Sequence, residues 1–137
     1  VLGDAQFREA MKNYALHFGA AFQIVDDVMD YTSSAEVMGK NVGDDLAEGK
    51  PTLPLIQAMK VAAPEDAEII RQAIKTGGLQ HLERIIRLVQ ETGALEYCHQ
   101  RAVKESDLAI AALSPLPPSI YKEALEGLAK LALNRVS

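Results

Sequence analysis

The chain has 137 residues, of which 48% are hydrophobic, 24% are charged and only 5% are aromatic. This length suits one compact domain, and a composition rich in Ala and Leu favours an all-α fold, so we expect residues 1–137 to form a single helical segment. The net charge of -5 argues against general electrostatic binding to nucleic acid or to anionic lipid.

The single cysteine and the short apolar runs exclude further classes. No run is long enough for a membrane helix and no basic-then-apolar leader opens the chain, which predicts a cytoplasmic protein without an integral membrane segment. Cys98 has no partner for an intramolecular disulfide and fits a reducing compartment. His17, His81 and His99 lack metal-ligand spacing and are expected to pack between helices or to lie at the surface.

The first third of the chain reads as a long helix followed by a loop. Apolar residues recur every three or four positions between Asp4 and Tyr31, with no proline among them, which predicts one continuous helix. The stretch TSSAEVMGKNVGDDLAEGK that follows is rich in breaking and capping residues. These are Ser33, Ser34, Gly39, Gly43 and Gly49. We therefore predict a loop there, holding at most a short helical turn.

Further helices are expected from residue 52 to the end of the chain. Thr52 can cap the next helix, Pro54 suits its first turn and Pro64 ends it. Pro64 then starts a short amphipathic helix that ends at Gly77. Additional helices are predicted over 79–93, 94–113 and 118–135, which makes about six helices and no strand.

Three carboxylates interrupt the apolar pattern in the stretch FQIVDDVMDY. With Asp26 set at zero, Asp30 falls at about 40° and Asp27 at about 100° around the helix, so the three share one side. Gln23 lies among them at about 60°, and Gly19 leaves open space one turn earlier. Such like charges repel one another, so a cation is expected beside them.

Two interpretations of these acids remain open at this point. Asp26, Asp27 and Asp30 can be a solvated helix face, since DDxxD also occurs by chance. Alternatively they are metal ligands, and oxygen ligands without His or Cys favour Mg²⁺, which binds one or two carboxylates together with waters and a phosphate. On the second interpretation the acids form half of a site whose other half is the diphosphate group of a ligand.

Lysines in the glycine-rich segment after the acids support a diphosphate site. Lys40 and Lys50 each lie next to a glycine, and two cations facing carboxylates can clamp a diphosphate, although both can also be ordinary surface lysines. Asp44 and Asp45 can pair with these lysines, contact the Mg²⁺ indirectly or cap a short turn; we favour pairing or capping.

Together these segments resemble a known enzyme family. FQIVDDVMDY followed by GKNVGDDLAEGKPTLPLIQAM is similar to the second aspartate-rich motif and lysine loop of the trans-type polyprenyl diphosphate synthases, closest to the octaprenyl branch. The segments ALEYCHQRAVKESDLAIAAL and YKEALEGLAKLAL are similar to the C-terminal helices of that family. The resemblance implies the C-terminal part of the helical isoprenoid synthase fold.

The resemblance also implies a reaction and a role for each site residue. Isopentenyl diphosphate units are added to an allylic diphosphate, such as farnesyl diphosphate growing to octaprenyl diphosphate, for quinone (ubiquinone) side-chain synthesis. Asp26, Asp27 and Asp30 would hold Mg²⁺, with Asp26 the preferred direct ligand, and Gln23 would lie near the reacting centre. Asp26 and Lys40 would be the catalytic residues. The side chains of Lys40 and Lys50 would bind the allylic diphosphate.

The chain departs from the family because it has no first aspartate-rich motif. We therefore expect it to be the C-terminal portion of a synthase, inactive alone, exposing apolar surface, and part of a homodimer in the full-length enzyme. Two other functions stay open: a non-catalytic diphosphate-binding subunit of a heteromeric synthase, and a terpene cyclase. The segment GKPTLPL resembles the chain-elongating enzymes and therefore argues against the cyclase. A helical bundle that binds no ligand would not explain why the acids and the two lysines occur together.

Overall fold

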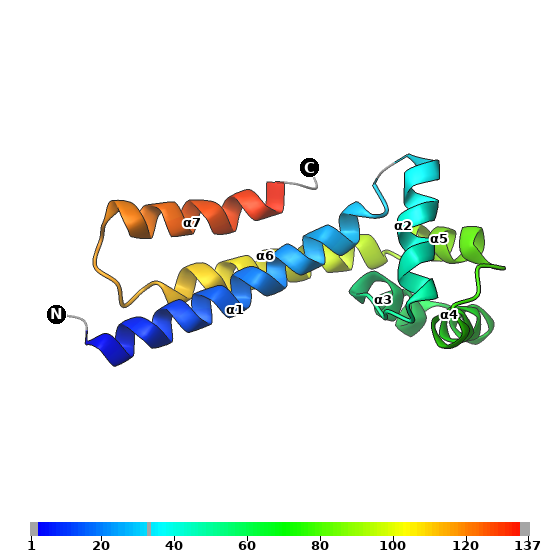
Figure 1. Cartoon of the computed structure of the whole chain (residues 1–137), viewed down its shortest axis with the longest axis horizontal. Helices are drawn as coiled ribbons and strands as arrows, with labels where there is room; N and C mark the ends of the chain where they lie inside the picture. The colour runs from blue at the N-terminus through cyan, green and yellow to red at the C-terminus, as the bar shows by residue number, and fades with distance from the viewer. Residues whose placement is uncertain (1–2, 33, 135–137) are drawn as a thin grey trace. The chain divides into compact units, whose positions relative to one another are not determined.

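The computed structural model describes residues 3–32 and 34–134, and it confirms the all-α prediction (Figure 1). Within these ranges it contains helices only. They are α1 (Asp4–Met29), α2 (Ala35–Ala47), α3 (Leu53–Val61), α4 (Pro64–Thr76), α5 (Leu82–Glu91), α6 (Ala94–Ala112) and α7 (Ile120–Leu133). Ser33 and Arg135, both named in the sequence predictions, lie outside the described residues.

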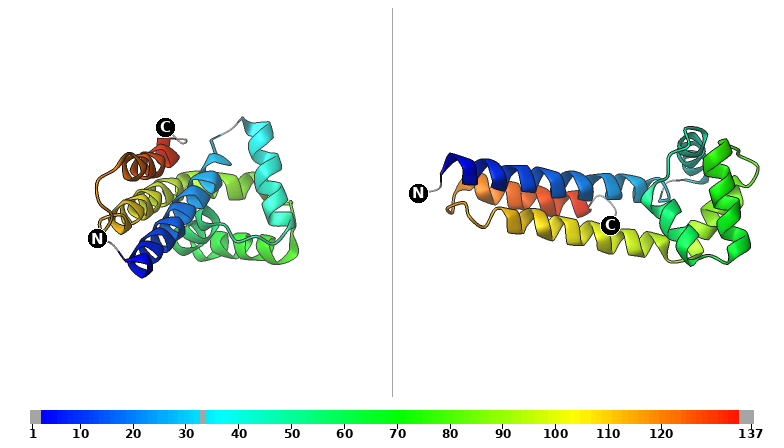
Figure 2. Two further views of the ribbon diagram at one scale, coloured as in Figure 1. Left: turned by 60° about the vertical axis from the view of Figure 1, so that its left-hand side comes forward. Right: turned by 90° about the horizontal axis from the view of Figure 1, so that it is seen from below.

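The chain divides into two compact units, which we describe separately. The first unit comprises residues 1–25 and 99–137, and Figures 1 and 2 show its parts of α1 and α6 running beside α7. Its core holds Tyr14, Ala109, Leu113 and Ala129. The Tyr14 hydroxyl donates a hydrogen bond to the Leu125 carbonyl over 2.7 Å, which joins α1 to α7.

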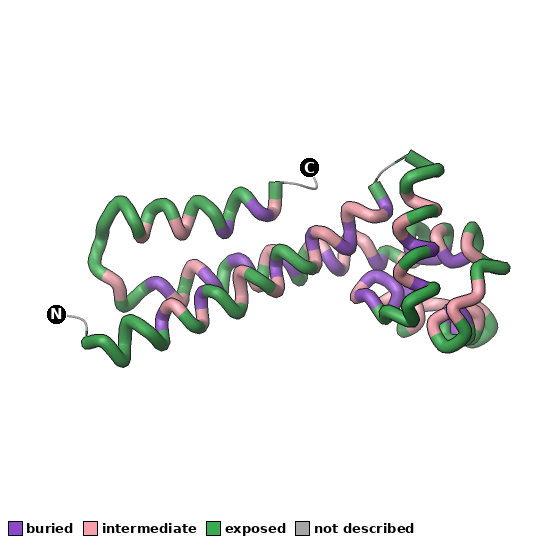
Figure 3. The backbone as a smooth tube through the Cα atoms, in the orientation of Figure 1, coloured by how far each residue is buried: buried purple, intermediate pink, exposed green. Residues whose placement is uncertain are grey.

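The first unit leaves much of α7 uncovered, as Figure 3 shows. Ile120 and Tyr121 are each 82% exposed and Leu131 is 60% exposed, so the expected exposed apolar surface is present. On the covered side, the buried Ser106 hydroxyl donates to the Ala129 carbonyl over 2.8 Å. This bond satisfies a polar group that would be costly to bury alone.

The second unit, Asp26–Cys98, is built from the short helices α2 to α5. Helices α2 and α3 each pack against α4 and α5, around a core that includes Leu46, Leu55, Ile70 and Ile85. Cys98 is also fully buried and forms no disulfide. The predicted caps of this unit are present in part: Pro54 lies in the first turn of α3, while Thr52 is the N-cap residue but makes no side-chain capping bond.

Helix α2 is the main difference from the sequence prediction, which made this segment a loop. The helix spans Ala35–Ala47, so Gly39 and Gly43 are helical residues. Ser34 caps it by accepting a hydrogen bond from the Val37 amide over 3.4 Å. Gly43 is buried, and a β-carbon added there would lie 3.6 Å from the side chain of Leu79, so helix packing compensates for the low helix propensity of glycine.

The end of α1 also differs from the prediction, by two residues. The last helical residue is Met29, and the Tyr31 and Thr32 amides continue the chain as a turn by bonding to the Val28 and Met29 carbonyls. Such a boundary shift is common, because the final turn of a helix frays. No described helix is long and apolar enough to span a membrane.

Candidate functional site

The three aspartates lie at the C-terminal end of α1. Asp26 and Asp27 belong to its last turn, and Asp30 is the first residue of the turn that follows. Asp27 is buried, whereas Asp26 and Asp30 are partly exposed. A β-carbon at Gly19 would meet nothing within 4 Å, so the open space predicted before the acids is present. Solvent therefore reaches two of the three carboxyl groups.

This position is electrostatically unfavourable for carboxylates. The C-terminal end of a helix carries partial negative charge, and the last turn of α1 has no basic residue. Burial raises the pKa of Asp30 to about 6, and the nearby charges of Asp45, Asp27 and Asp26 add to this rise while Lys50 opposes it. Burial, with smaller effects of Asp45, Asp30 and Asp27, likewise raises the pKa of the neighbouring Tyr31. The site therefore favours added positive charge.

Helix α2 brings Asp45 and Lys50 into this acidic cluster. The Lys50 ammonium lies 3.9 Å from the Asp45 carboxylate, which confirms that one of the two predicted lysines pairs with an aspartate. Burial raises the pKa of Asp45, and Lys50 works against that rise. Since Asp45 and Lys50 both act on Asp30, the structure gathers residues from the end of α1 and the end of α2 at one place.

The backbone at the end of α2 explains how Lys50 reaches Asp45. The Lys50 amide donates to the Asp45 carbonyl over 2.9 Å, and the Gly49 amide donates to the Leu46 carbonyl over 3.0 Å. Gly49 has a φ of 68°, in the left-handed region that favours glycine. This pair of bonds is the Schellman motif, which reverses the chain and returns Lys50 over the last turn of the helix.

One of the two predicted lysines is not brought into the cluster. Lys40 is an exposed residue of α2, five positions before Asp45 and therefore about 140° away around that helix. It is not among the charges that shift the pKa of Asp30 or Asp45. Gln23 is an exposed residue of α1, one turn before Asp26. The binding roles of both side chains stay predictions.

The carboxylate oxygens are suitable ligands for Mg²⁺, although the described side chains do not surround a metal position by themselves. Within residues 3–32 and 34–134 no group of three or more His, Cys, Asp or Glu side chains is arranged to hold a metal ion. Carboxylates are nonetheless ligands that Mg²⁺ accepts, usually only one or two at a time, with water and phosphate oxygens completing the shell. The mutual repulsion at Asp30 is what a divalent cation would relieve.

Sequence reasoning chose the acids and Lys50 as candidates, but it did not include Tyr31 or the direct effect of Asp45 on Asp30. The buried Tyr31 phenol lies near Asp45, Asp30 and Asp27, whose charges add to the rise in its pKa, and its place directly after Asp30 was the only signal of this in the sequence. For Asp45, the spacing left three roles open, and only the folded end of α2 distinguishes between them.

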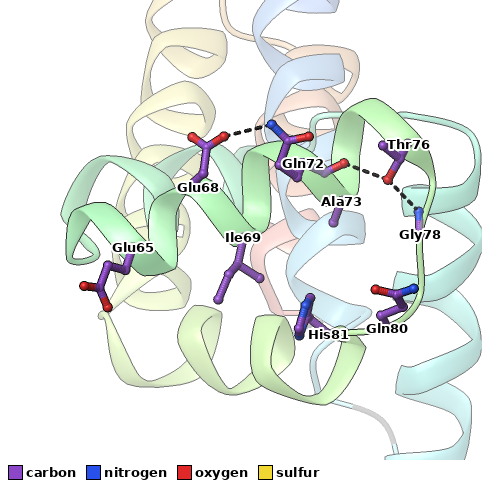
Figure 4. A pocket seen from close by; sticks show the side chains of 9 residues that line it. All are labelled: Glu65, Glu68, Ile69, Gln72, Ala73, Thr76, Gly78, Gln80 and His81. Atoms are coloured by element: carbon purple, nitrogen blue, oxygen red, sulfur yellow. Dashed lines mark hydrogen bonds between the residues drawn. The ribbon is translucent and has the colours of Figure 1, made fainter.

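A separate cavity of about 580 Å³ lies along α4 and the segment that leads into α5 (Figure 4). Ile69 and Ala73 form its apolar wall, and Glu65, Gln72 and His81 are among its polar lining residues. None of the predicted site residues lines this cavity. It is therefore distinct from the acidic cluster.

Taken together, the fold and the cluster define an all-α protein with carboxylates and a lysine gathered at the ends of two helices. The family model described as polyprenyl synthetase matches residues 1–91. The chain therefore belongs to the polyprenyl synthetase family, which confirms the resemblance drawn from its motifs.

Relatives of known activity resemble nearly the whole chain. The all-trans-nonaprenyl-diphosphate synthase (geranyl-diphosphate specific) of Rhodobacter capsulatus is 53% identical over 134 residues, which are 98% of this chain and 41% of that protein. The octaprenyl diphosphate synthase of Escherichia coli strain K12 is 48% identical over 128 residues, or 93% of this chain and 40% of that protein. The chain thus spans about two-fifths of the length of these relatives.

Solved structures confirm the isoprenoid synthase fold. A polyprenyl synthase from Caulobacter crescentus CB15, complexed with calcium and isoprenyl diphosphate, matches with a TM-score of 0.81 and 39% identity, over 98% of this chain and 42% of that one. A geranylgeranyl pyrophosphate synthase from Corynebacterium glutamicum, also complexed with calcium and isoprenyl diphosphate, matches with a TM-score of 0.75 and 31% identity, over 93% and 40%.

Proposed function

We propose that this chain is the C-terminal part of a trans-polyprenyl diphosphate synthase, which adds isopentenyl diphosphate units to an allylic diphosphate. The observation that carries the proposal is the cluster of Asp26, Asp27 and Asp30 at the negative end of α1, with Lys50 held beside it by Asp45. Repelling carboxylates next to a lysine suit a ligand that brings both a divalent cation and an anion. The chain spans about two-fifths of the length of these relatives, which supports the proposal that it is one part of the enzyme.

In this proposal the reaction is electrostatic catalysis rather than attack by a protein nucleophile. The allylic carbon–oxygen bond breaks and the diphosphate leaves with the electron pair; the double bond of isopentenyl diphosphate then attacks the allylic carbon, and loss of a proton restores a double bond. Lys50 and Lys40 would hold the departing diphosphate by charge-assisted hydrogen bonds.

Asp26, Asp27 and Asp30 would hold the cation, and Gln23 would lie by the reacting carbon. When bound there, Mg²⁺ supplies positive charge that stabilises the departing diphosphate. Asp26 and Asp30, being partly exposed, are the carboxylates open to a ligand from solvent. Asp45 would keep the Lys50 ammonium in place until the diphosphate enters.

The finer assignments follow the relatives. We propose a long-chain product of about eight or nine isoprene units for quinone side-chain synthesis, since the relatives named above make octaprenyl and nonaprenyl diphosphate. The allylic starter would be farnesyl or geranyl diphosphate, and the full-length enzyme would be a cytoplasmic homodimer. Without a first aspartate-rich motif, the 137-residue chain would be inactive by itself.

The test is an elongation assay on the longer protein that contains this chain. The protein is incubated with Mg²⁺, isopentenyl diphosphate and either geranyl or farnesyl diphosphate, and product length is measured by chromatography. We expect a long-chain product with at least one starter, and none from the 137-residue chain alone. A protein that binds diphosphate with Mg²⁺ but forms no product would instead support the non-catalytic subunit.

A variant pair links the activity to the cluster. Lys50→Gln should raise the KM for the allylic diphosphate by about 10-fold or more, since it removes a charge-assisted contact. Lys104→Gln removes an exposed lysine of α6 and should leave the KM unchanged. Equal effects of the two substitutions would show that Lys50 has no specific role.

A further inference from the structure

In the second unit, two neighbouring helices are each followed by a glycine whose backbone is in the left-handed region. Gly49 follows α2 with a φ of 68°, and Gly77 follows α4 with a φ of 67°. The Gly77 amide donates to the Ala73 carbonyl over 2.9 Å, which closes the last turn of α4. Since α2 packs against α4, both helix ends belong to one packed pair.

Gly77 also approaches the end of α2 closely. A β-carbon added at Gly77 would lie 3.1 Å from the Ala47 carbonyl oxygen, 3.3 Å from the Ala47 α-carbon and 3.4 Å from the Leu46 carbonyl oxygen. These are backbone atoms of α2, which cannot turn aside as a flexible side chain would. The contact is reciprocal, because a β-carbon at Gly49 would lie 3.3 Å from the Ile74 carbonyl oxygen of α4.

The crowded backbone lies next to the turn that leads to Lys50: the tightest approach is to the Ala47 carbonyl oxygen, and the Leu46 carbonyl oxygen lies at the edge of ordinary contact distance. The Leu46 carbonyl accepts the hydrogen bond of the Gly49 amide, and the Asp45 carbonyl, one residue earlier, accepts that of the Lys50 amide. A side chain at Gly77 would therefore press on Ala47, the last residue of α2, two residues before the glycine at which the chain reverses. Any shift there moves Lys50 relative to Asp45, whose carboxylate lies only 3.9 Å from the lysine ammonium.

We propose that Gly77 is a positioning residue for Lys50. Its missing side chain lets α4 pack on the last carbonyl groups of α2, and this contact fixes the helix end from which Lys50 returns to Asp45. The inference rests on the proposed function only where it assigns Lys50 to the allylic diphosphate. Gly77 lies far from the acidic motif in sequence and meets the backbone of Leu46 and Ala47, so its effect on the site would pass through the end of α2.

Gly93 provides a matched control. It has a φ of 78°, so alanine there suffers the same backbone strain as at Gly77, but its β-carbon would meet nothing within 4 Å. Gly77→Ala and Gly93→Ala therefore share the strain and differ in the clash with α2. A second pair, Gly77→Asn and Gly93→Asn, lowers the strain, because asparagine adopts left-handed backbone more readily, and keeps the clash.

The first measurement is amide hydrogen exchange in the enzyme that contains this chain. Gly77→Ala should speed exchange at the Gly49 and Lys50 amides by about 10-fold relative to Gly93→Ala, because their hydrogen bonds lose support. The amides of α5, which carries Ile85 and Val89 of the buried core of the second unit, report unfolding of that unit and should exchange alike in both variants. If Gly77→Ala does not fold, the asparagine pair is compared in the same way. Unchanged exchange at Lys50 in a folded Gly77 variant would overturn the proposal.

The second measurement separates positioning from a merely structural role. Gly77→Ala should raise the KM for the allylic diphosphate by about 10-fold and leave the KM for isopentenyl diphosphate unchanged, while Gly93→Ala changes neither. If Gly77→Ala alters exchange but neither KM, its effect does not reach the site. If the unsubstituted enzyme forms no prenyl product, the proposed function fails, and the exchange data still decide whether Gly77 positions Lys50.

Discussion

Replacing Asp30 by asparagine should stabilise the protein at neutral pH. Asp30 lies beyond the last turn of α1, where burial and three other aspartates raise the pKa of its carboxyl group from 3.8 to about 6. Each pKa unit corresponds to about 1.4 kcal/mol, which gives an upper limit of about 3 kcal/mol for the cost of the charge. Because the side chain is partly exposed, solvent screening reduces this to about 1 kcal/mol.

The sign of the pH dependence follows from the direction of that change. The folded protein holds the Asp30 proton more tightly than the unfolded chain does, so the stabilisation is complete below about pH 4 and is lost as pH rises through about 6. Asp30→Asn removes this loss. The difference in unfolding free energy between the variant and the unsubstituted chain should therefore be near zero at pH 4 and about 1 kcal/mol in favour of the variant at pH 7.5.

Urea unfolding of the 137-residue chain measures this difference, in metal-free buffer at several pH values between 4 and 7.5. Asp107→Asn, which changes an exposed aspartate of α6, is the matched control and should show no pH-dependent difference. An Asp30→Asn chain that is less stable at pH 7.5, or a difference that does not vary with pH, would refute the electrostatic reasoning.

Three further outcomes are expected. Asp26→Ala in the full-length enzyme should reduce product formation roughly 100-fold without loss of stability, because it removes a proposed cation ligand and a repelling charge; thermal unfolding checks the second part. Tyr14→Phe should cost about 1 kcal/mol in urea unfolding through loss of the bond to the Leu125 carbonyl, whereas Tyr121→Phe, at an exposed position, should cost nothing. Ile70→Ala, in the fully buried core of the second unit, should cost about 3 kcal/mol.

The sequence predicted the helices that carry strong local signals. Pro54, Pro64 and Gly77 mark helix ends where they were expected, because each fixes or permits a backbone conformation by itself. Helix α2 was missed for the opposite reason. Gly39 and Gly43 lower local helix propensity, and the packing at Gly43 comes from Leu79 and Leu82, residues far along the chain.

The candidate site could be predicted by residue type but not by arrangement. Spacing identified Asp26, Asp27 and Asp30, since periodicity alone places them on one side of a helix. In the sequence Lys40 and Lys50 were equally good candidates, because each lies next to a glycine. The turn after α2 brings Lys50, but not Lys40, near Asp30. Distances of this kind depend on how helices pack, which no local pattern contains.

Chemical labelling of the buried Cys98 can report transient opening of the core. As the sole thiol of the 137-residue chain, and fully buried, it can react with an alkylating reagent only when the core around it opens, so the labelling rate of this chain measures how often that happens. A ligand that binds only the closed form must slow this reaction by the factor by which it stabilises the protein. Added Mg²⁺ and inorganic diphosphate could thus be detected as protection of one sulfur atom, without any turnover.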